Sequence, residues 1–422
     1  MGLLDQLVDE TQNGWEYDRA MQIDEVRAKL SHPNGAYAQC DDGEWRWVKN
    51  PHNTPENVED VLRLDPWFRS RLAHDQFADM VTWQGKKLSD PMVTEIRMSI
   101  ARTYKLRPSV ALMQEMATFV GHKLGHHPVR DWLNTLRWDG TERMGGLLAN
   151  YAGCDATDLH VVMSRRFMIS CVSRVMVPGE KVDTVLILAG PQGCGKSTFF
   201  RALTGAEWFR DSAIDMRNKD AYMAMRGAWV YELAELAAMR PRDAETVKAF
   251  ISAQVDHFRP PYGRNQVEQP RQVVFVGTTN EPSFLNDPTG ARRFWPAEVK
   301  GAPKIIEVGR DRAQLWAEAV EAYKGGERWW LEKNESGALE DAQEQYQQID
   351  PWDGPIEDWL TLNMNMNGFT AADVLTQAIK VEIDKQHKGM SQRVGGILTR
   401  MGFVKRRARV EGKRPYCWYK SD

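Results

Sequence analysis

Three short apolar runs stand out in the pattern of hydrophobic and polar positions. Residues 184–189 (TVLILA), 228–232 (AWVYE) and 272–278 (QVVFVGT) are apolar or β-branched at almost every position. Continuous runs of this length are typical of buried strands. Helical spacing of apolar residues follows at residues 311–324. The pattern predicts an α/β core with a parallel sheet over residues 181–330.

The chain before this core carries mainly helical spacing. Asp90 followed by Pro91 is a helix start, because proline is tolerated in the first turn. Residues 51–180 are therefore predicted to form a helical domain, with helices at 57–64, 90–104, 108–124 and 159–175. The polar segment 1–50 is predicted to be a lead-in with a short hairpin around Gly43.

The chain after the core shows a different pattern, in which helices are followed by basic residues. Residues 331–354 are predicted to be a linker region, and 355–422 a separate basic domain. Thr370 with Asp373 three residues later is a capping signal at the start of a helix. Another helix at 391–401 and two short strands complete the order helix, helix, basic hairpin. This order is typical of a winged-helix domain.

Composition narrows the class of protein. The 422 residues contain no run of 18 apolar residues, so no membrane span is expected. The acidic N-terminus lacks the pattern of a signal peptide. The five cysteines are scattered without any C-x-x-C, which favours a reducing compartment over disulfides or a zinc finger. His122 and His126 have a spacing that metal sites use, but helix-end surface histidines are the preferred interpretation.

The first apolar run leads into a glycine-rich motif. Residues 190–197 read GPQGCGKS, a complete G-x-x-x-x-G-K-[ST] between a predicted strand and a predicted helix. Glycines let backbone N–H groups converge on phosphate, and the helix N-terminus adds partial positive charge. ATP is the expected ligand, with Ser197 on Mg²⁺. The expected phosphate-binding residues are Gly190, Pro191, Gln192, Gly193, Cys194, Gly195, Lys196, Ser197 and Thr198.

Hydrolysis needs an acid near the metal and a polar group on the attacking water. Glu232 ends the second apolar run and Glu235 follows it. One would hold Mg²⁺, with Glu232 the expected metal ligand, and the other would activate water. Two surface glutamates at a helix start are the alternative. Asn280 follows the third run, where its amide could polarise the water or sense the γ-phosphate.

Two arginines follow in the segment DPTGARRFWP. An arginine from a neighbouring subunit can stabilise charge on the γ-phosphate in the transition state. Arg293 is the expected arginine finger, which is the arginine that acts on a neighbour's nucleotide. Arg292 is the expected intersubunit or loop contact. The alternative is a structural pair that bridges to acidic residues.

Cations gather in two further segments. Residues 247–271 are predicted to be a helix followed by an exposed hairpin. The side chains of this segment suit contact with the phosphate backbone of single-stranded DNA, and a solvated turn is the alternative. The C-terminal hairpin and the helix before it suit phosphate contact or protein docking. The expected DNA-binding residues are Lys248, Arg259, Tyr262, Arg264, Arg393, Lys405, Arg406, Arg407 and Arg409.

The ordered motifs GPQGCGKS, WVYELAEL, VKAFISAQVDHFRPPYGR, PRQVVFVGTTNE and DPTGARRFWP resemble the virulence-associated protein E family. Its members are encoded by phages and mobile islands and are similar to superfamily 3 helicases. The resemblance implies an AAA+-like P-loop core, a ring that is expected to be a homo-hexamer, and ATP-driven movement on DNA. It also implies a cytoplasmic protein in a bacterial host. The spacing of Glu232 and Glu235 departs from the adjacent acids of many P-loop ATPases.

The motifs and the resemblance predict an ATP- and Mg²⁺-dependent helicase or translocase that acts on single-stranded DNA or an origin duplex. A separate primase is an expected partner, because the first 180 residues offer no polymerase carboxylate set on strands. The alternative is a nucleotide-gated DNA-binding regulator or origin-recognition protein without processive unwinding. A small-molecule kinase is disfavoured, since it leaves both basic segments without a role.

Overall fold

A parallel sheet of five strands occupies the centre of the larger part of the chain. The strand order is β13-β7-β12-β9-β8, and every neighbouring pair is parallel. All residues of β7 and β12 are buried, which explains their continuous apolar sequences. The strands are β7 (Val185–Ala189), β8 (Phe209–Arg210), β9 (Val230–Ala234), β12 (Val274–Thr279) and β13 (Phe294–Glu298). The predicted α/β fold with a parallel sheet is confirmed.

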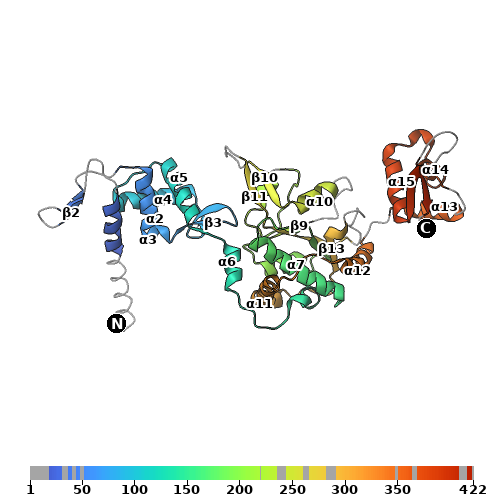
Figure 1. The fold of residues 1–422 in the computed structure, drawn as a ribbon, viewed down its shortest axis with the longest axis horizontal. Helices are drawn as coiled ribbons and strands as arrows, with labels where there is room; N and C mark the ends of the chain where they lie inside the picture. The colour runs from blue at the N-terminus through green and yellow to red at the C-terminus, as the bar shows by residue number, and fades with distance from the viewer. Residues whose placement is uncertain are drawn as a thin grey trace. The chain divides into compact units, whose positions relative to one another are not determined.

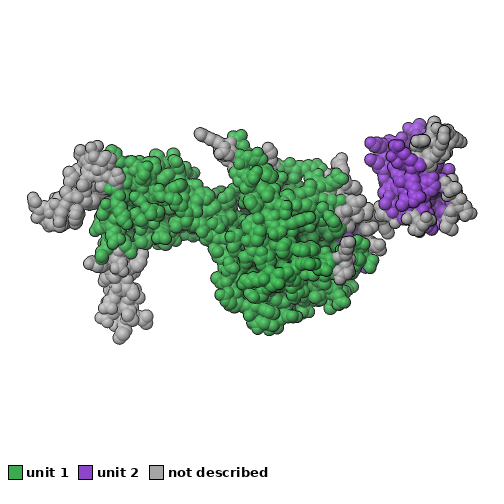
Figure 2. All heavy atoms as spheres, in the orientation of Figure 1, with its two compact units in different colours: residues 1–281, 289–341 green, residues 282–288, 342–422 purple. Residues whose placement is uncertain are grey.

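The structure is a computed structural model, and it divides into two units (Figure 1, Figure 2). One unit comprises residues 1–281 and 289–341, and the other comprises 282–288 and 342–422. The described residues are 19–30, 37–39, 44–47, 52–218, 220–234, 244–259, 266–281, 291–346, 350–363, 368–407 and 416–420.

Three helices pack around the sheet in one buried cluster. They are α7 (Asp158–Met176), α8 (Lys196–Thr204) and α11 (Ile305–Lys324). The indole of Trp229 donates to the Cys171 carbonyl at 2.9 Å, and that of Trp316 donates to the Leu203 carbonyl at 2.8 Å. The two rings are 4.2 Å apart. Residues 159–175 are predicted to belong to the helical domain, but α7 shares its core with the sheet.

The remaining helices and strands of this part of the chain lie between or beside the strands of the sheet. In Figure 1 the antiparallel β10–β11 hairpin projects from the sheet on the side away from α7 and α11. These elements are α6 (Pro128–Thr135), η1 (Met144–Gly146), η2 (Leu147–Tyr151), α9 (Asp220–Ala224), α10 (Ala244–Ser252), β10 (Val255–Phe258), β11 (Val267–Pro270), η5 (Ala291–Arg293) and α12 (Lys333–Glu344).

Residues 52–126 form a second core in the same unit. Its helices are α2 (Pro55–Leu64), α3 (Pro66–Arg69), α4 (Asp90–Tyr104) and α5 (Val110–Lys123). The structure adds a sheet to the predicted helices, in the order β5-β4-β3-β6. Its strands are β3 (Leu72–Asp75), β4 (Met80–Trp83), β5 (Lys86–Lys87) and β6 (Gly125–His126). Strands of two to four residues are too short to show a hydrophobic period.

The region before residue 52 is described only in pieces. A helix covers residues 19–29, and Val26 on this helix and Leu30 at its end are buried in the second core. The strands β1 (Tyr37–Gln39) and β2 (Trp45–Trp47) pair antiparallel, as the sequence predicts for a hairpin around Gly43. The His122 ring lies 3.9 Å from the His74 ring, centre to centre. Within the described ranges no three His, Cys, Asp or Glu side chains form a group that could hold a metal ion.

The second unit has its own small core. The predicted capping box is present, because Thr370 Oγ1 accepts the Asp373 N–H and the Asp373 carboxylate accepts the Thr370 N–H. Phe369 pairs with Trp418 beside the terminal hairpin. The elements are α13 (Asp353–Leu362), α14 (Ala371–Gln377), η6 (Ile383–Lys385), α15 (Lys388–Arg400), β14 (Phe403–Arg407) and β15 (Tyr416–Lys420). Across the described part of the chain, the helices are too short or too polar to traverse a lipid bilayer.

Candidate nucleotide site

The glycine-rich segment forms the loop between β7 and α8. Gly193 and Gly195 have φ angles of 77° and 99°, in the left-handed region that side chains disfavour. Gly190 donates its N–H to the Thr279 carbonyl at 3.0 Å, and a Cβ on it would lie 2.9 Å from the Val299 carbonyl oxygen. Three glycines are thus needed for the loop to turn and to lie against the sheet.

Lys196 is the first residue of α8, and its side chain is almost fully buried. Its Nζ donates to the carbonyls of Gly190 and Pro191, both at 2.8 Å, and lies 3.8 Å from Cys194 Sγ. The ammonium is therefore held inside the loop. Together with the N-terminus of α8, it makes the loop a favourable place for an anion.

Glu232 is the central acid behind this loop. Its side chain is 2% exposed, and Oε1 accepts the hydroxyl of Ser197 at 2.8 Å and the hydroxyl of Thr278. Its Oε2 is buried without a hydrogen-bond partner among the residues that the structure describes. A buried carboxylate oxygen needs a partner. The structure therefore presents an unsatisfied oxygen ligand beside the Ser197 hydroxyl.

Thr278 was missed by the sequence analysis. It lies on β12, whose parallel register with β9 pairs Thr278 with Ala234 and Val276 with Glu232. The available signal was a hydroxyl residue near the carboxyl end of an apolar strand. That signal became informative only after β12 was known to lie beside β9.

Asn280 follows β12 at the same end of the sheet. Thr279 is opposite Ala189 in the β12–β7 register, which brings exposed Asn280 to the level of the loop. Glu235 lies outside the described residues. We call residues 190–197 with Glu232, Thr278 and Asn280 the loop edge.

The predicted arginines lie at the opposite end of the sheet. Phe294 pairs with Val185, so Arg292 and Arg293 precede the start of β13 where β7 also starts. The five residues of β7 separate this end from the loop by about 16 Å at ~3.3 Å per residue. Arg293 Nε donates to Ser252 Oγ at 3.0 Å and lies 3.9 Å from Asp183 Oδ2.

Lys248 lies on α10, in the part of residues 247–271 that is predicted to be a helix. It is half-buried, and burial together with the charge of Arg293 lowers the pKa of its ammonium. We call Lys248, Arg292 and Arg293 the arginine edge. These three residues, predicted as finger or DNA-binding residues, lie at the end of the sheet where β7 and β13 start.

The hairpin that follows α10 is fixed at its base. The buried Arg271 guanidinium forms an ion pair with Asp256 and lies 4.9 Å from the centre of the Phe250 ring. Arg226 donates to Gln269 at 3.2 Å and lies over Phe258. Arg259 is exposed at the end of β10. The predicted contacts Tyr262 and Arg264 lie outside the described residues.

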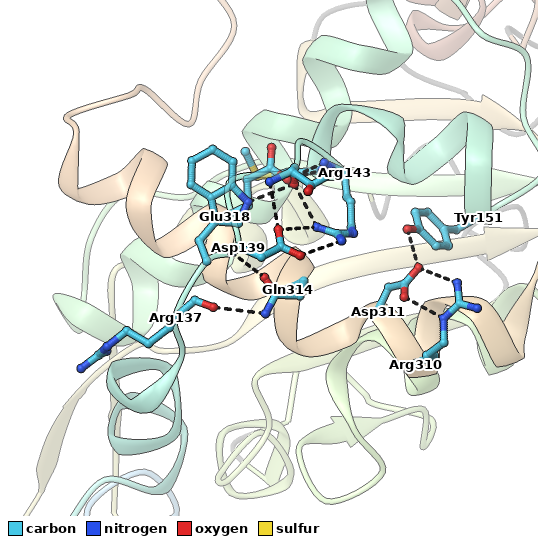
Figure 3. Close-up of polar contacts among 11 residues, drawn as sticks. Arg137, Asp139, Arg143, Tyr151, Arg310, Asp311, Gln314 and Glu318 are labelled. Carbon is cyan, nitrogen blue, oxygen red and sulfur yellow. Dashed lines mark hydrogen bonds and ion pairs between the residues drawn. The ribbon is translucent and has the colours of Figure 1, made fainter.

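A polar cluster joins η1 to α11 in the same unit (Figure 3). The Arg143 guanidinium binds both carboxylate oxygens of Asp139 at 2.8 Å, which lowers the pKa of Asp139 to about 2. The nearly buried Glu318 carboxylate accepts the N–H groups of Arg143 and Met144 at 2.6 and 2.8 Å. At its other end α11 begins beside the loop, with Ile305 near Gly195.

The predicted DNA contacts of the second unit separate into two groups. Arg393 binds Asp350 through two hydrogen bonds of 2.8 and 2.6 Å and lies 4.0 Å from the Trp352 ring centre. The exposed cations Lys405, Arg406 and Arg407 lie on β14. Arg409 is outside the described residues. Arg393 is thus bound to an acid within the unit, whereas the β14 cations are exposed, with Lys405 and Arg407 lying 4.7 and 5.0 Å from the centre of the Tyr416 ring.

The fold is that of an α/β protein whose glycine-rich loop lies at the carboxyl end of a parallel sheet. Residues 133–348 match the virulence-associated protein E-like domain, which is half of the chain. The chain belongs to this family. The match includes all of the loop edge and the arginine edge, and the predicted family resemblance is confirmed.

A solved structure is similar in fold. The apo structure of the NrS-1 C-terminal region has a TM-score of 0.50 at 11% identity, covering 87% of this chain and 99% of that chain. An A-form apo structure of the same region has a TM-score of 0.48 at 11% identity, covering 88% and 100%. At this identity the likeness concerns the fold alone. Among curated proteins, none matches the chain.

Proposed function

We propose that this chain is a P-loop ATPase with an AAA+-like core that acts as a DNA helicase or translocase in replication of a phage or mobile element. The observation that carries the proposal is the contact of Ser197 with the buried Glu232 carboxylate directly behind the glycine-rich loop. Ligands of open α/β sheets bind at the carboxyl ends of the strands, where this contact lies.

The loop edge is suited to ATP. The amides of the turn and the N-terminus of α8 would bind the phosphates, and Lys196 would balance the charge of the β- and γ-phosphates. The phosphate-binding set remains the predicted one, from Gly190 to Thr198. The sheet supports this role, because the loop strand β7 lies between β12 and β13, and both neighbours are parallel to it.

The donor set also fits Mg²⁺. The partnerless Glu232 Oε2 and the Ser197 hydroxyl are hard oxygen ligands of the kind that this ion prefers. Bound Mg²⁺ would neutralise charge on the β- and γ-phosphate oxygens. Thr278 would hold Glu232 in place. Glu232 and Glu235 would share metal binding and activation of water, with Asn280 polarising that water.

The distance between the two edges supports a nucleotide site shared between copies. Arg293 is too far from the loop of its own chain to reach a γ-phosphate there, so it would act on a nucleotide held by a neighbouring copy. We propose a ring that is a homo-hexamer, as the family resemblance implies. Arg292 would contact the same neighbour.

DNA would be bound by the hairpin and by the second unit. Arg259 on the hairpin and the β14 cations are exposed and suited to phosphate. The order of helices and strands in the second unit supports a winged-helix domain. A separate primase and the cytoplasm of a bacterial host belong to the same proposal.

The alternative function is a nucleotide-gated DNA-binding regulator. The exposed β14 cations favour it, because they can contact a phosphate backbone without any turnover at the loop. The candidate acid Glu232, the amide of Asn280 and the candidate finger Arg293 favour an ATP-driven motor instead.

The test is steady-state ATP hydrolysis with and without single-stranded DNA, with particle size measured by light scattering on the same sample. We expect turnover that DNA stimulates, from a ring-sized particle. A particle that binds ATP but never hydrolyses it, with or without DNA, would support the regulator and contradict the motor.

A further inference from the structure

The β10–β11 hairpin depends on contacts outside its own sheet. Among the described residues its two strands pair only with each other. A two-stranded hairpin by itself is marginally stable in water. The buried ion pair of Arg271 with Asp256 holds the end where the hairpin joins the larger sheet. The far end of β10, at the buried Phe258, needs contacts from another part of the molecule.

Arg226 contacts both strands of this hairpin. It lies between α9 and β9, and its side chain is 16% exposed. Its Nε donates to Gln269 Oε1 on β11 at 3.2 Å, and its guanidinium lies 5.1 Å from the centre of the Phe258 ring on β10. Gln269 is opposite Asp256 in the register, two residues from Phe258, so these contacts are on one face of the hairpin. One side chain therefore holds the inner face of both strands.

A third contact of Arg226 comes from the second core, residues 52–126. Arg226 Nη2 lies 2.9 Å from Asp79 Oδ2, and Asp79 Oδ1 lies 3.2 Å from His74 Nε2. Asp79 is in the turn between β3 and β4. An ion pair between a carboxylate and a guanidinium restricts the direction of the arginine side chain. Asp79 is thus placed to orient Arg226 toward the hairpin.

The rest of the β3–β4 turn is packed beside the base of the hairpin. Phe77 is 3% exposed and belongs to the buried cluster of the parallel sheet. Ala78 is also buried, and a Cβ on Gly227 would lie 3.1 Å from Ala78 Cβ. His127 Nε2 and Gln272 Oε1, which lies between β11 and β12, form a hydrogen bond of 2.6 Å. The ion pair of Arg226 is therefore part of a wider contact.

We propose that Arg226 is a positioning residue for the β10–β11 hairpin and that Asp79 holds Arg226 in the orientation that this role requires. The second core would then fix the direction in which the hairpin meets its ligand. This inference rests on the proposed contact of the hairpin with single-stranded DNA. Asp79 lies outside residues 133–348, so the link is not contained in the matched family domain.

The first experiment measures hydrogen exchange of the backbone amides of β10 and β11 in the full chain. Arg226→Ala should raise their exchange rates about tenfold, because the strands lose the contacts at Gln269 and Phe258. The amides of β7 and β12 should keep their rates. Arg63→Ala, which breaks an exposed ion pair with Asp60 on α2, is the matched control and should leave the hairpin unchanged. Unchanged exchange in Arg226→Ala would overturn the proposal.

The second experiment measures the Kd for a labelled oligothymidylate by fluorescence anisotropy. Arg226→Ala is expected to raise Kd about tenfold, because the hairpin is no longer held in one orientation. Asp79→Asn should raise it about threefold, since a partly exposed ion pair contributes less. Arg226→Lys should recover part of the affinity, because it keeps the charge beside Asp79 without the forked donors. Asp60→Asn is the matched control and should keep the wild-type Kd.

A double-mutant cycle gives a readout that two unrelated structural contacts would not produce. If Asp79 acts through Arg226, adding Asp79→Asn to Arg226→Ala should not weaken DNA binding further. Independent, additive effects would overturn the link. If the wild-type chain binds no single-stranded DNA, the proposed DNA contact fails, whereas faster hairpin exchange in Arg226→Ala would still support the positioning role. If the wild-type chain binds DNA and Arg226→Ala binds it equally well, only this inference fails.

Discussion

The two ends of the parallel sheet are organised in opposite ways. At the loop edge, charged groups have partners within the chain: Lys196 is held by loop carbonyls, and Glu232 by two hydroxyls. At the arginine edge, Arg293 donates to Ser252 and lies 3.9 Å from Asp183 Oδ2, and burial together with the charge of Arg293 lowers the pKa of Lys248. The acid at the loop edge keeps one buried oxygen, Glu232 Oε2, without a hydrogen-bond partner among the described residues, whereas the arginine edge brings cations together where β7 and β13 start.

Removing the loop cation should have the largest effect. Lys196→Ala is expected to reduce ATP turnover by about 10³-fold or more, because the variant loses the charge that balances the β- and γ-phosphates. Turnover is measured by phosphate release, and an unchanged thermal unfolding curve serves as the control for folding. Turnover at the wild-type rate would remove the nucleotide site from the loop edge.

Removing the finger should separate binding from turnover. Arg293→Ala is expected to lower kcat by about 10³-fold and to keep ATP binding, since the arginine lies far from the loop of its own chain. Kinetics and binding of a fluorescent ATP analogue are measured on the same sample. Loss of ATP binding in a monomeric preparation of this variant would contradict the separation of the two edges.

Removing one hydroxyl at the loop edge should have the smallest effect. Thr278→Val is expected to lower kcat about tenfold, because Glu232 loses one of two hydroxyl donors. The same loss is expected to lower the free energy of unfolding by about 1 kcal/mol. Thr278→Ser keeps a hydroxyl and is the matched control. Equal rates for the two variants would show that Thr278 does not position Glu232.

Local sequence predicted the parts of the site that depend on neighbouring residues. The strand, the loop and the helix from 185 to 204 follow from one continuous segment. The capping box at Thr370 and the bounds of α4 at Asp90–Tyr104 are likewise local. These elements could be predicted because turn glycines, caps and helical spacing act over a few residues.

The rest depends on contacts between distant segments. The role of Thr278 needs the register between β9 and β12, which are more than 40 residues apart. The place of Lys248 needs the packing of α10 beside Arg293. The sheet β3–β6 is built from strands too short for a period to appear. None of these relations is visible in a single stretch of sequence.

The long helix α11 connects two distant parts of the larger unit. Its 20 residues span about 30 Å. It begins beside Gly195, and Glu318, in its second half, accepts the backbone N–H groups of Arg143 and Met144. The same helix therefore lies against the glycine-rich loop and also holds the backbone at the start of η1, so one continuous element joins these two parts of the larger unit.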